Sequence, residues 1–139
     1  MNNKLKAVVA GRDTNCYRFQ DLDSGEFFSV PISVIHEIVD FPNQLVDADG
    51  MLRTGSVIDM VMKTSQEDTC RFYYPSTKIY QKKSNPVAAA IQTALATSIL
   101  LFLEHLDEVD KQTRMKIVKA LSTHDDHAVI TLINSIIFK

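Results

Sequence analysis

Two patterns of apolar residues divide this chain at Asn85-Pro86. Before that point, short runs of β-branched and aromatic residues alternate with polar ones and are separated by Gly, Pro and Asp. After it, residues 87–139 contain no Gly and no Pro, and their apolar residues recur at helical spacing. A period of two predicts strands, and recurrence every three or four residues predicts helices. We therefore expect a β-rich unit over residues 1–84 and a helical C-terminal unit over residues 85–139.

Five short strands and one short helix are predicted in the first unit. The strands cover residues 5–9, 16–22, 26–30, 56–63 and 69–74. Asp23-Ser24-Gly25 supplies a hairpin turn, since Gly tolerates a positive φ. Pro31 ends the third strand, because proline cannot donate to a ladder. Ser33 is expected to cap a helix over residues 34–39, and residues 77–81 to continue the sheet.

Three helices are predicted in the second unit. Asn85, with Pro86 at the first helical position, opens a helix that runs to about Val109. Asp110 or Thr113 opens the second helix, and Asp125 or Asp126 caps the third.

The middle of the first long helix is apolar on every side, which is typical of a helix that is buried on every side. An exposed apolar surface of that size would be sticky, so we expect a homodimer or larger oligomer through the helices. The residues assigned to this interface are Ile99, Leu100, Leu101 and Leu103.

The predicted order of strand, strand, strand, short helix, strand, strand is the element order of the OB-fold. Residues 8–30 have the shape of the first three strands of S1-type OB domains, and residues 52–61 resemble their entry to strand four. The resemblance covers roughly residues 4–81. The glycine usual at the end of the first strand is displaced to Gly11, and the histidine after strand three has no match. The predicted fold is α+β: a five-stranded small β-barrel, OB- or SH3-like, followed by a three-helix unit.

Composition restricts the function further. A formal net charge of −2 gives no long-range attraction to phosphates or anionic lipid, so a nucleic-acid partner would have to be recognised by a local face. Cys16 and Cys70 lack a CxxC spacing and fall in predicted strands, where small buried thiols are expected. The N-terminus has no signal-peptide pattern, which indicates the cytoplasm. Residues 87–103 are uncharged but too short and too polar for a membrane span.

Motifs for catalysis or metal binding are weak. His124 and His127 would share a helix face as metal ligands could, yet the aspartates between them already serve as helix caps. His36 has no nucleophile within sequence reach. Asp59 is a buried carboxylate if its strand neighbours Val57 and Val61 face inward; we favour the alternative, in which Ile58, Met60 and Met62 form the core face. We expect no catalytic residue, no metal and no cofactor, although a small enzyme or ligand-binding barrel that uses Asp59, His36 or the His124/His127 pair remains a third hypothesis.

Aromatic and basic residues interleave along the strands. Single-strand binders stack bases on strand aromatics and contact phosphates through Lys and Arg, although such alternation is also typical of a solvated face. By strand parity Phe72 and Tyr74 oppose Arg71, so we expect Tyr73 to be the main exposed stacking residue. The candidates are Lys4, Lys6, Arg18, Lys63, Arg71 and Tyr73.

The leading hypothesis is therefore a non-enzymatic binding protein whose barrel engages single-stranded nucleic acid or a nucleoprotein. The alternative is a protein–protein adaptor or inhibitor that docks on a partner protein, which charge neutrality would suit.

Overall fold

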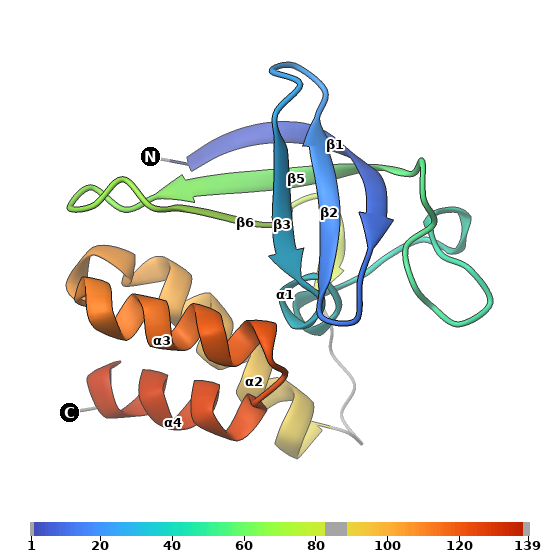
Figure 1. Ribbon diagram of the computed structural model, residues 1–139. Coiled ribbons are helices and arrows are strands. Elements are labelled where there is room, and N and C mark those ends of the chain that lie inside the picture. The colour runs from blue at the N-terminus through green and yellow to red at the C-terminus, as the bar shows by residue number, and fades with distance from the viewer. Residues whose placement is uncertain (1, 83–88, 138–139) are drawn as a thin grey trace.

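Alternating apolar residues build a five-stranded antiparallel sheet that curls into a nearly closed barrel (Figure 1). The computed structural model describes residues 2–82 and 89–137. The strands follow the spatial order β3-β2-β1-β5-β6. Their bounds are β1 (Asn2–Arg12), β2 (Cys16–Asp21), β3 (Phe27–Pro31), β5 (Val57–Thr64) and β6 (Arg71–Pro75).

The long strand β1 pairs with both β2 and β5, so it forms the centre of the sheet. Successive side chains of a strand point to opposite faces, and one face of this sheet is buried. Ile58 and Met60 of β5 are fully buried, which confirms the core face favoured from the sequence. Asp59 lies on the opposite face, where its carboxylate is 3.7 Å from the ammonium of Lys6.

A short helix, α1 (Ile32–Ile38), follows directly from Pro31. Ser33 does not cap it; this residue is buried inside the helix, and a hydrogen bond of 3.1 Å joins its hydroxyl to Nδ1 of His124. Strand β4 (Val39–Asp40) pairs with β7 (Gln81–Lys82) in a separate two-stranded sheet. Of residues 77–81, which were expected to continue the sheet, only Gln81 lies in a strand, and that strand belongs to the second sheet; residues 77–80 form a turn.

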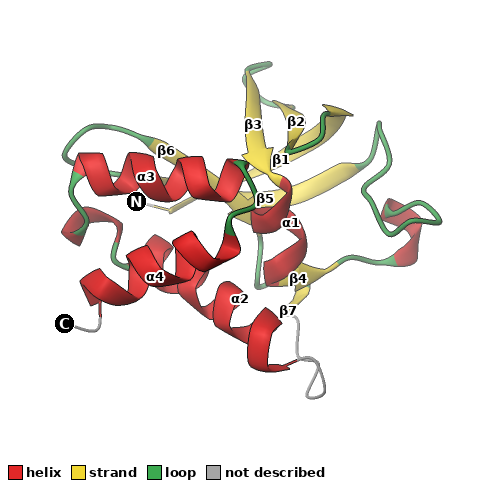
Figure 2. Cartoon of the chain, turned by 60° about the horizontal axis from the view of Figure 1, so that its bottom comes forward, coloured by secondary structure: helices red, strands yellow, loops and turns green. Residues whose placement is uncertain are grey.

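The C-terminal unit comprises α2 (Ala89–Glu104), the 3-10 turn η2 (Leu106–Glu108), α3 (Lys111–Ser122) and α4 (Asp126–Ile137). With α1, the described chain has four α-helices (Figure 2). Asp110 caps α3 by accepting a hydrogen bond of 2.7 Å from the amide of Thr113. The first long helix ends at Glu104, earlier than predicted, and its predicted start lies outside the described residues.

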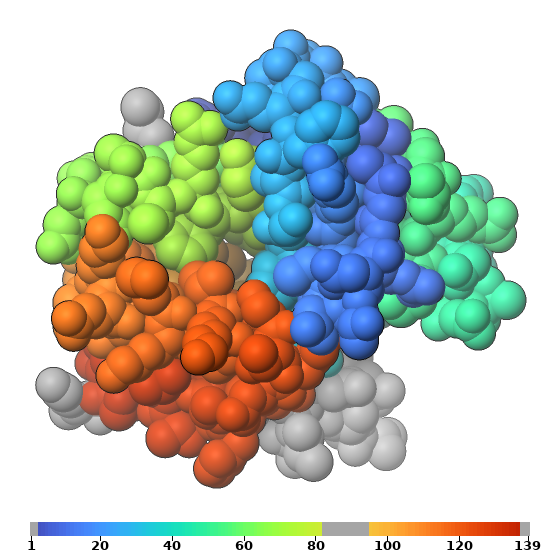
Figure 3. Space-filling view, in the orientation of Figure 1, coloured from blue at the N-terminus to red at the C-terminus, as the bar shows by residue number. Residues whose placement is uncertain are grey.

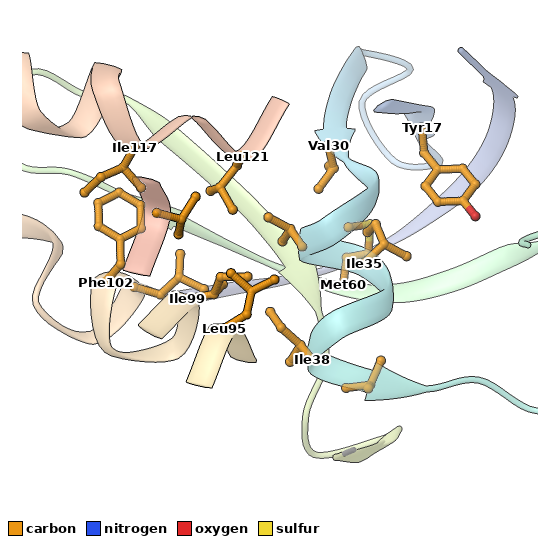
Figure 4. Packing of buried hydrophobic residues seen from close by; sticks show 14 of the residues in the cluster. Tyr17, Val30, Ile35, Ile38, Met60, Leu95, Ile99, Phe102, Ile117 and Leu121 are labelled. Carbon is orange, nitrogen blue, oxygen red and sulfur yellow. The ribbon is translucent and has the colours of Figure 1, made fainter. Parts of the chain in front are cut away.

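Helix α1 lies between the barrel and the three C-terminal helices (Figure 4). Figure 4 shows Tyr17 and Met60 on its barrel side and Leu95 and Ile99 on its helical side, all within one continuous apolar cluster. The barrel and the C-terminal helices thus share a core.

Two of the four residues assigned to an oligomer interface belong to that core. Ile99 and Leu103 are buried within the chain, whereas Leu100 and Leu101 are half-buried. Among the described residues, no helix is both long enough and apolar enough to cross a bilayer.

Candidate functional site

The barrel has one seam, where the terminal strands β3 and β6 face each other without a backbone ladder. Side chains close it. The rings of Phe28 and Tyr73 stack with centroids 3.8 Å apart and planes inclined by 13°. Nη1 of Arg71 lies 3.2 Å from a carboxylate oxygen of Glu26. Tyr73 is therefore half-buried in the seam and is not the exposed stacking residue expected from strand parity.

The two faces of β6 are the reverse of the prediction. Tyr73 is the cross-strand partner of Met62, and paired residues share a face of the sheet. Phe72 instead faces α2, where its ring meets Phe102 edge to face at 5.4 Å. Beside it, Lys63 donates a hydrogen bond to the carbonyl of Leu103. The C-terminal helices cover this outer face, and for that reason an aromatic residue points away from the barrel interior.

The outer face of the β2–β3 hairpin carries the most accessible aromatic and basic pair. The guanidinium of Arg18 lies 4.6 Å from the ring centroid of Phe27, a cation–π geometry. Phe27 is 52% exposed, and Leu22 beside the turn is 51% exposed. We call Arg18 and Phe27 the hairpin platform. Phe27 was missed from the sequence, although alternation across the hairpin turn places it on the same face as Arg18.

Three predicted residues meet at the end of the barrel next to the hairpin turn. Lys4, Arg71 and Tyr73 line a hollow of about 370 Å³. Its other charged lining residues are Asp21, Asp23 and Glu26. Three carboxylates therefore outnumber the two cations of this hollow, and Lys63 is not among its lining residues.

A second, apolar hollow opens where β3, β6 and α3 meet (Figure 3). We call it the seam pocket; its volume is about 110 Å³. Ser29 and Arg71 are its polar residues on the barrel side, and Val118 belongs to its helical side. The remaining lining residues are Val30, Pro31, Val34, Phe72, Tyr73, Ile99, Phe102, Leu103 and Leu121.

Helix α3 holds the loop between β5 and β6 through a buried arginine. Arg114 is 1% exposed and donates hydrogen bonds to Asp68 at 2.6 Å and to the carbonyl of Leu106 at 3.0 Å. The hydroxyl of Ser65, and then the guanidinium of Arg114, hold the pKa of Asp68 well below its usual range. The amide of Gln66 also donates to the carboxylate of Asp107 at 2.8 Å. The loop is thus fixed by the C-terminal unit.

His36 belongs to a hydrogen-bond network in the barrel. Its Nε2 is hydrogen-bonded to the hydroxyl of the fully buried Tyr17, which also accepts a bond of 3.0 Å from the amide of Leu52. Burial raises the pKa of Tyr17. Burial likewise raises the pKa of Cys16 and Cys70, which are half-buried, so both thiols are protonated at neutral pH.

The described residues contain no group of three or more His, Cys, Asp or Glu side chains arranged to hold a metal ion. Comparisons of the chain with protein-family models, with curated proteins and with solved structures find no match. Functional inference therefore rests on the geometry of the platform, the hollow at the hairpin end and the seam pocket.

Proposed function

We propose that this protein binds single-stranded nucleic acid on the outer face of its β2–β3 hairpin. The observation that supports this most directly is the hairpin platform, where a half-exposed ring lies under a guanidinium group. Nucleic-acid bases stack on aromatic rings and on guanidinium planes, whatever the sequence of the strand.

The strand order supports an OB-type assignment over an SH3-like one. In an OB-fold the first strand pairs with the second and the fourth, and the short helix follows the third. Here β1 pairs with β2 and with β5, the fourth strand of the barrel, and α1 directly follows β3. The barrel is open between β3 and β6, its third and fifth strands. Members of this class bind oligonucleotides on the face of their second and third strands, which is the position of the platform.

Ion pairs reduce the contribution that Lys6 and Arg71, two of the predicted cations, can make to the binding of phosphates. Lys6 is 3.7 Å from Asp59, and Arg71 is 3.2 Å from Glu26. Because these charges are partly neutralised, stacking would provide a larger share of the affinity than in a basic protein. We expect micromolar binding.

The test is fluorescence polarisation with labelled 12-nucleotide DNA and RNA at low and moderate salt. Wild-type protein should bind, and Phe27→Ala should weaken binding about tenfold, since one stacked base contributes about 1–3 kcal/mol. Arg18→Ala should weaken it as well. Ile79→Ala is the matched control, because Ile79 is another exposed apolar residue outside the platform. Absence of binding by the wild type at low salt would overturn the proposal.

A second candidate, docking on a partner protein, is favoured by the exposed apolar pair Leu22 and Phe27 beside a hollow of mixed charge in which carboxylates are in excess. A photo-crosslinking amino acid at position 27 distinguishes the two. It should join the protein to nucleic acid under the first proposal and to a polypeptide under the second.

We also propose that the chain forms a homo-oligomer through α2, in which the half-buried Leu100 and Leu101 remain available. Sedimentation equilibrium of the wild type and of Leu101→Lys tests this. A monomeric wild type, or an oligomer that Leu101→Lys leaves intact, would overturn it.

A further inference from the structure

We propose that the seam pocket receives one unstacked pyrimidine base from the strand that crosses the hairpin platform. This inference rests on the proposed function and adds to it a base preference and a second contact site.

The platform and the pocket are adjacent. Ser29 is the cross-strand partner of Arg18, so the two side chains share the outer face of the hairpin. Ser29 also lines the seam pocket. A strand whose base stacks on the platform therefore reaches the pocket along β3.

The apolar walls of the pocket can contact the face of an aromatic ring, and its polar groups can form hydrogen bonds with atoms at the edge of that ring. Val34, Phe72 and Leu121 contribute apolar surface. The hydroxyl of Ser29 can donate or accept a hydrogen bond, and the guanidinium of Arg71 can donate to a carbonyl oxygen. Pyrimidine bases carry such carbonyl acceptors.

The size of the pocket selects a single ring. An apolar protein cavity of about 150 Å³ accommodates benzene, a six-membered ring. The seam pocket, at about 110 Å³, is smaller but open to the surface, so a six-membered ring would enter it in part, with its outer edge at the opening. A fused purine would enter only if the seam widened, which would separate Phe28 from Tyr73 and Arg71 from Glu26.

Cations on α3 are available for the phosphates next to that base. The helix that contributes Val118 also carries the exposed residues Lys111, Lys116 and Lys119. Within the part of the chain that the structure describes, these three lysines have no carboxylate partner within 4.0 Å, unlike Lys6 and Arg71. Lys111, two turns before Val118, and Lys119, next to Val118, lie toward the side of α3 that carries Val118, whereas Lys116 lies on the opposite face. An anionic backbone beside the pocket would therefore meet the unpaired charges of Lys111 and Lys119.

The test compares dT12 and dA12 binding to the wild type and to Val118→Phe, which fills the pocket from its half-buried helical side. The wild type should bind dT12 about tenfold more tightly than dA12, and Val118→Phe should reduce dT12 binding to the dA12 level. Ile79→Phe, which adds a ring at an exposed position outside the pocket, should keep the preference. Circular dichroism melting establishes that each variant is folded.

A measurement on the wild type covers the case in which Val118→Phe does not fold. With labelled methyl groups, an intermolecular NOE should join a thymine of dT12 to Val118 or Leu121. Binding without base preference, or without that NOE, would overturn this inference and leave the platform intact. Failure of both oligonucleotides to bind would instead overturn the proposed function.

Discussion

Arg114 of α3 reaches across to the β5–β6 loop and donates a hydrogen bond of 2.6 Å to Asp68, forty-six residues earlier in the chain. The same guanidinium binds the carbonyl of Leu106, and Asp68 in turn accepts from Ser65. One buried cation thus joins a loop of the barrel to the start of the C-terminal hairpin of helices.

Arg114→Met should lower the free energy of unfolding by about 3 kcal/mol. Removing one member of a buried ion pair leaves the other charge without its cationic partner, and here it also removes one of the two donors to the Leu106 carbonyl, the other being the amide of Val109. Urea denaturation measures the change. Lys116→Met on the exposed side of the same helix is the control and should alter stability by less than about 0.5 kcal/mol. Equal effects of the two substitutions would show that the buried pair is unimportant.

Stability should fall with acidification through Asp68. The Ser65 hydroxyl and Arg114 lower the pKa of Asp68 in the folded state, whereas an aspartate in the unfolded chain has a pKa of about 4. The stabilisation is therefore complete above about pH 5 and is lost as the pH falls from there toward the folded-state pKa. Asp68→Asn should be less stable than the wild type at pH 7, and the difference between them should shrink toward pH 2.5.

Other carboxylates with a lowered pKa do not affect the comparison between the wild type and Asp68→Asn. Backbone amides lower the pKa of Asp13 and Asp110, so both contribute to acid unfolding. Both are present in Asp68→Asn as well, and their effect cancels in the difference. A difference between the two proteins that stays constant with pH would contradict the role assigned to Asp68.

Phe28→Ala should destabilise the barrel by about 2 kcal/mol, because it removes half-buried apolar area and the stacked contact with Tyr73. Phe27→Ala, one residue earlier on the exposed face, should change stability little. Thermal melting compares the two, and the reverse order of effects would disprove the closure of the seam by Phe28.

Tyr17→Phe should cost about 1–3 kcal/mol, since the buried amide of Leu52 then loses its acceptor. Tyr74→Phe is a suitable control, because the hydroxyl of Tyr74 has no hydrogen-bond partner among the described residues. A Tyr17→Phe protein as stable as this control would show that water replaces the missing hydroxyl.

Replacing Lys111, Lys116 and Lys119 together by glutamine should reduce the salt dependence of oligonucleotide binding. Each phosphate contact in a single strand contributes about 0.7 to the slope of log K against log salt, so Lys111 and Lys119 together account for about 1.4. Lys116, on the face of α3 opposite Val118, should add little. Lys78→Gln, on an exposed loop, shows how much the loss of one positive charge outside α3 changes the slope. An unchanged slope in the triple variant would exclude these lysines from the phosphate path.

Local sequence patterns correctly predicted the features that depend on residues close together in the chain. The period-two run around Ile58 and Met60 predicted the core face correctly. Asp110 was one of the two residues expected to open the second helix, because capping involves residues three apart. The faces of β6 could not be predicted this way. Phe72 points outward because Phe102 covers it, a contact thirty residues away. Arg114 resembles a solvated helix residue until Asp68 is placed beside it.

The candidate site shows the same division. Arg18, Lys4 and Arg71 were identified by residue type, but their carboxylate and aromatic neighbours come from the register of the hairpin and the curvature of the sheet. The seam pocket has no sequence signal, since it arises where two strand edges and a helix approach one another.

No backbone ladder joins β3 to β6, so this is the boundary of the barrel that widens most easily. Every other strand boundary is held by backbone hydrogen bonds, whereas this one depends on Phe28 against Tyr73 and on the exposed Arg71–Glu26 pair. If β3 and β6 move apart, these side chains separate, but no backbone hydrogen bond between strands is broken. Strain imposed by a bound molecule will therefore be taken up along this line, and the rest of the sheet will keep its register.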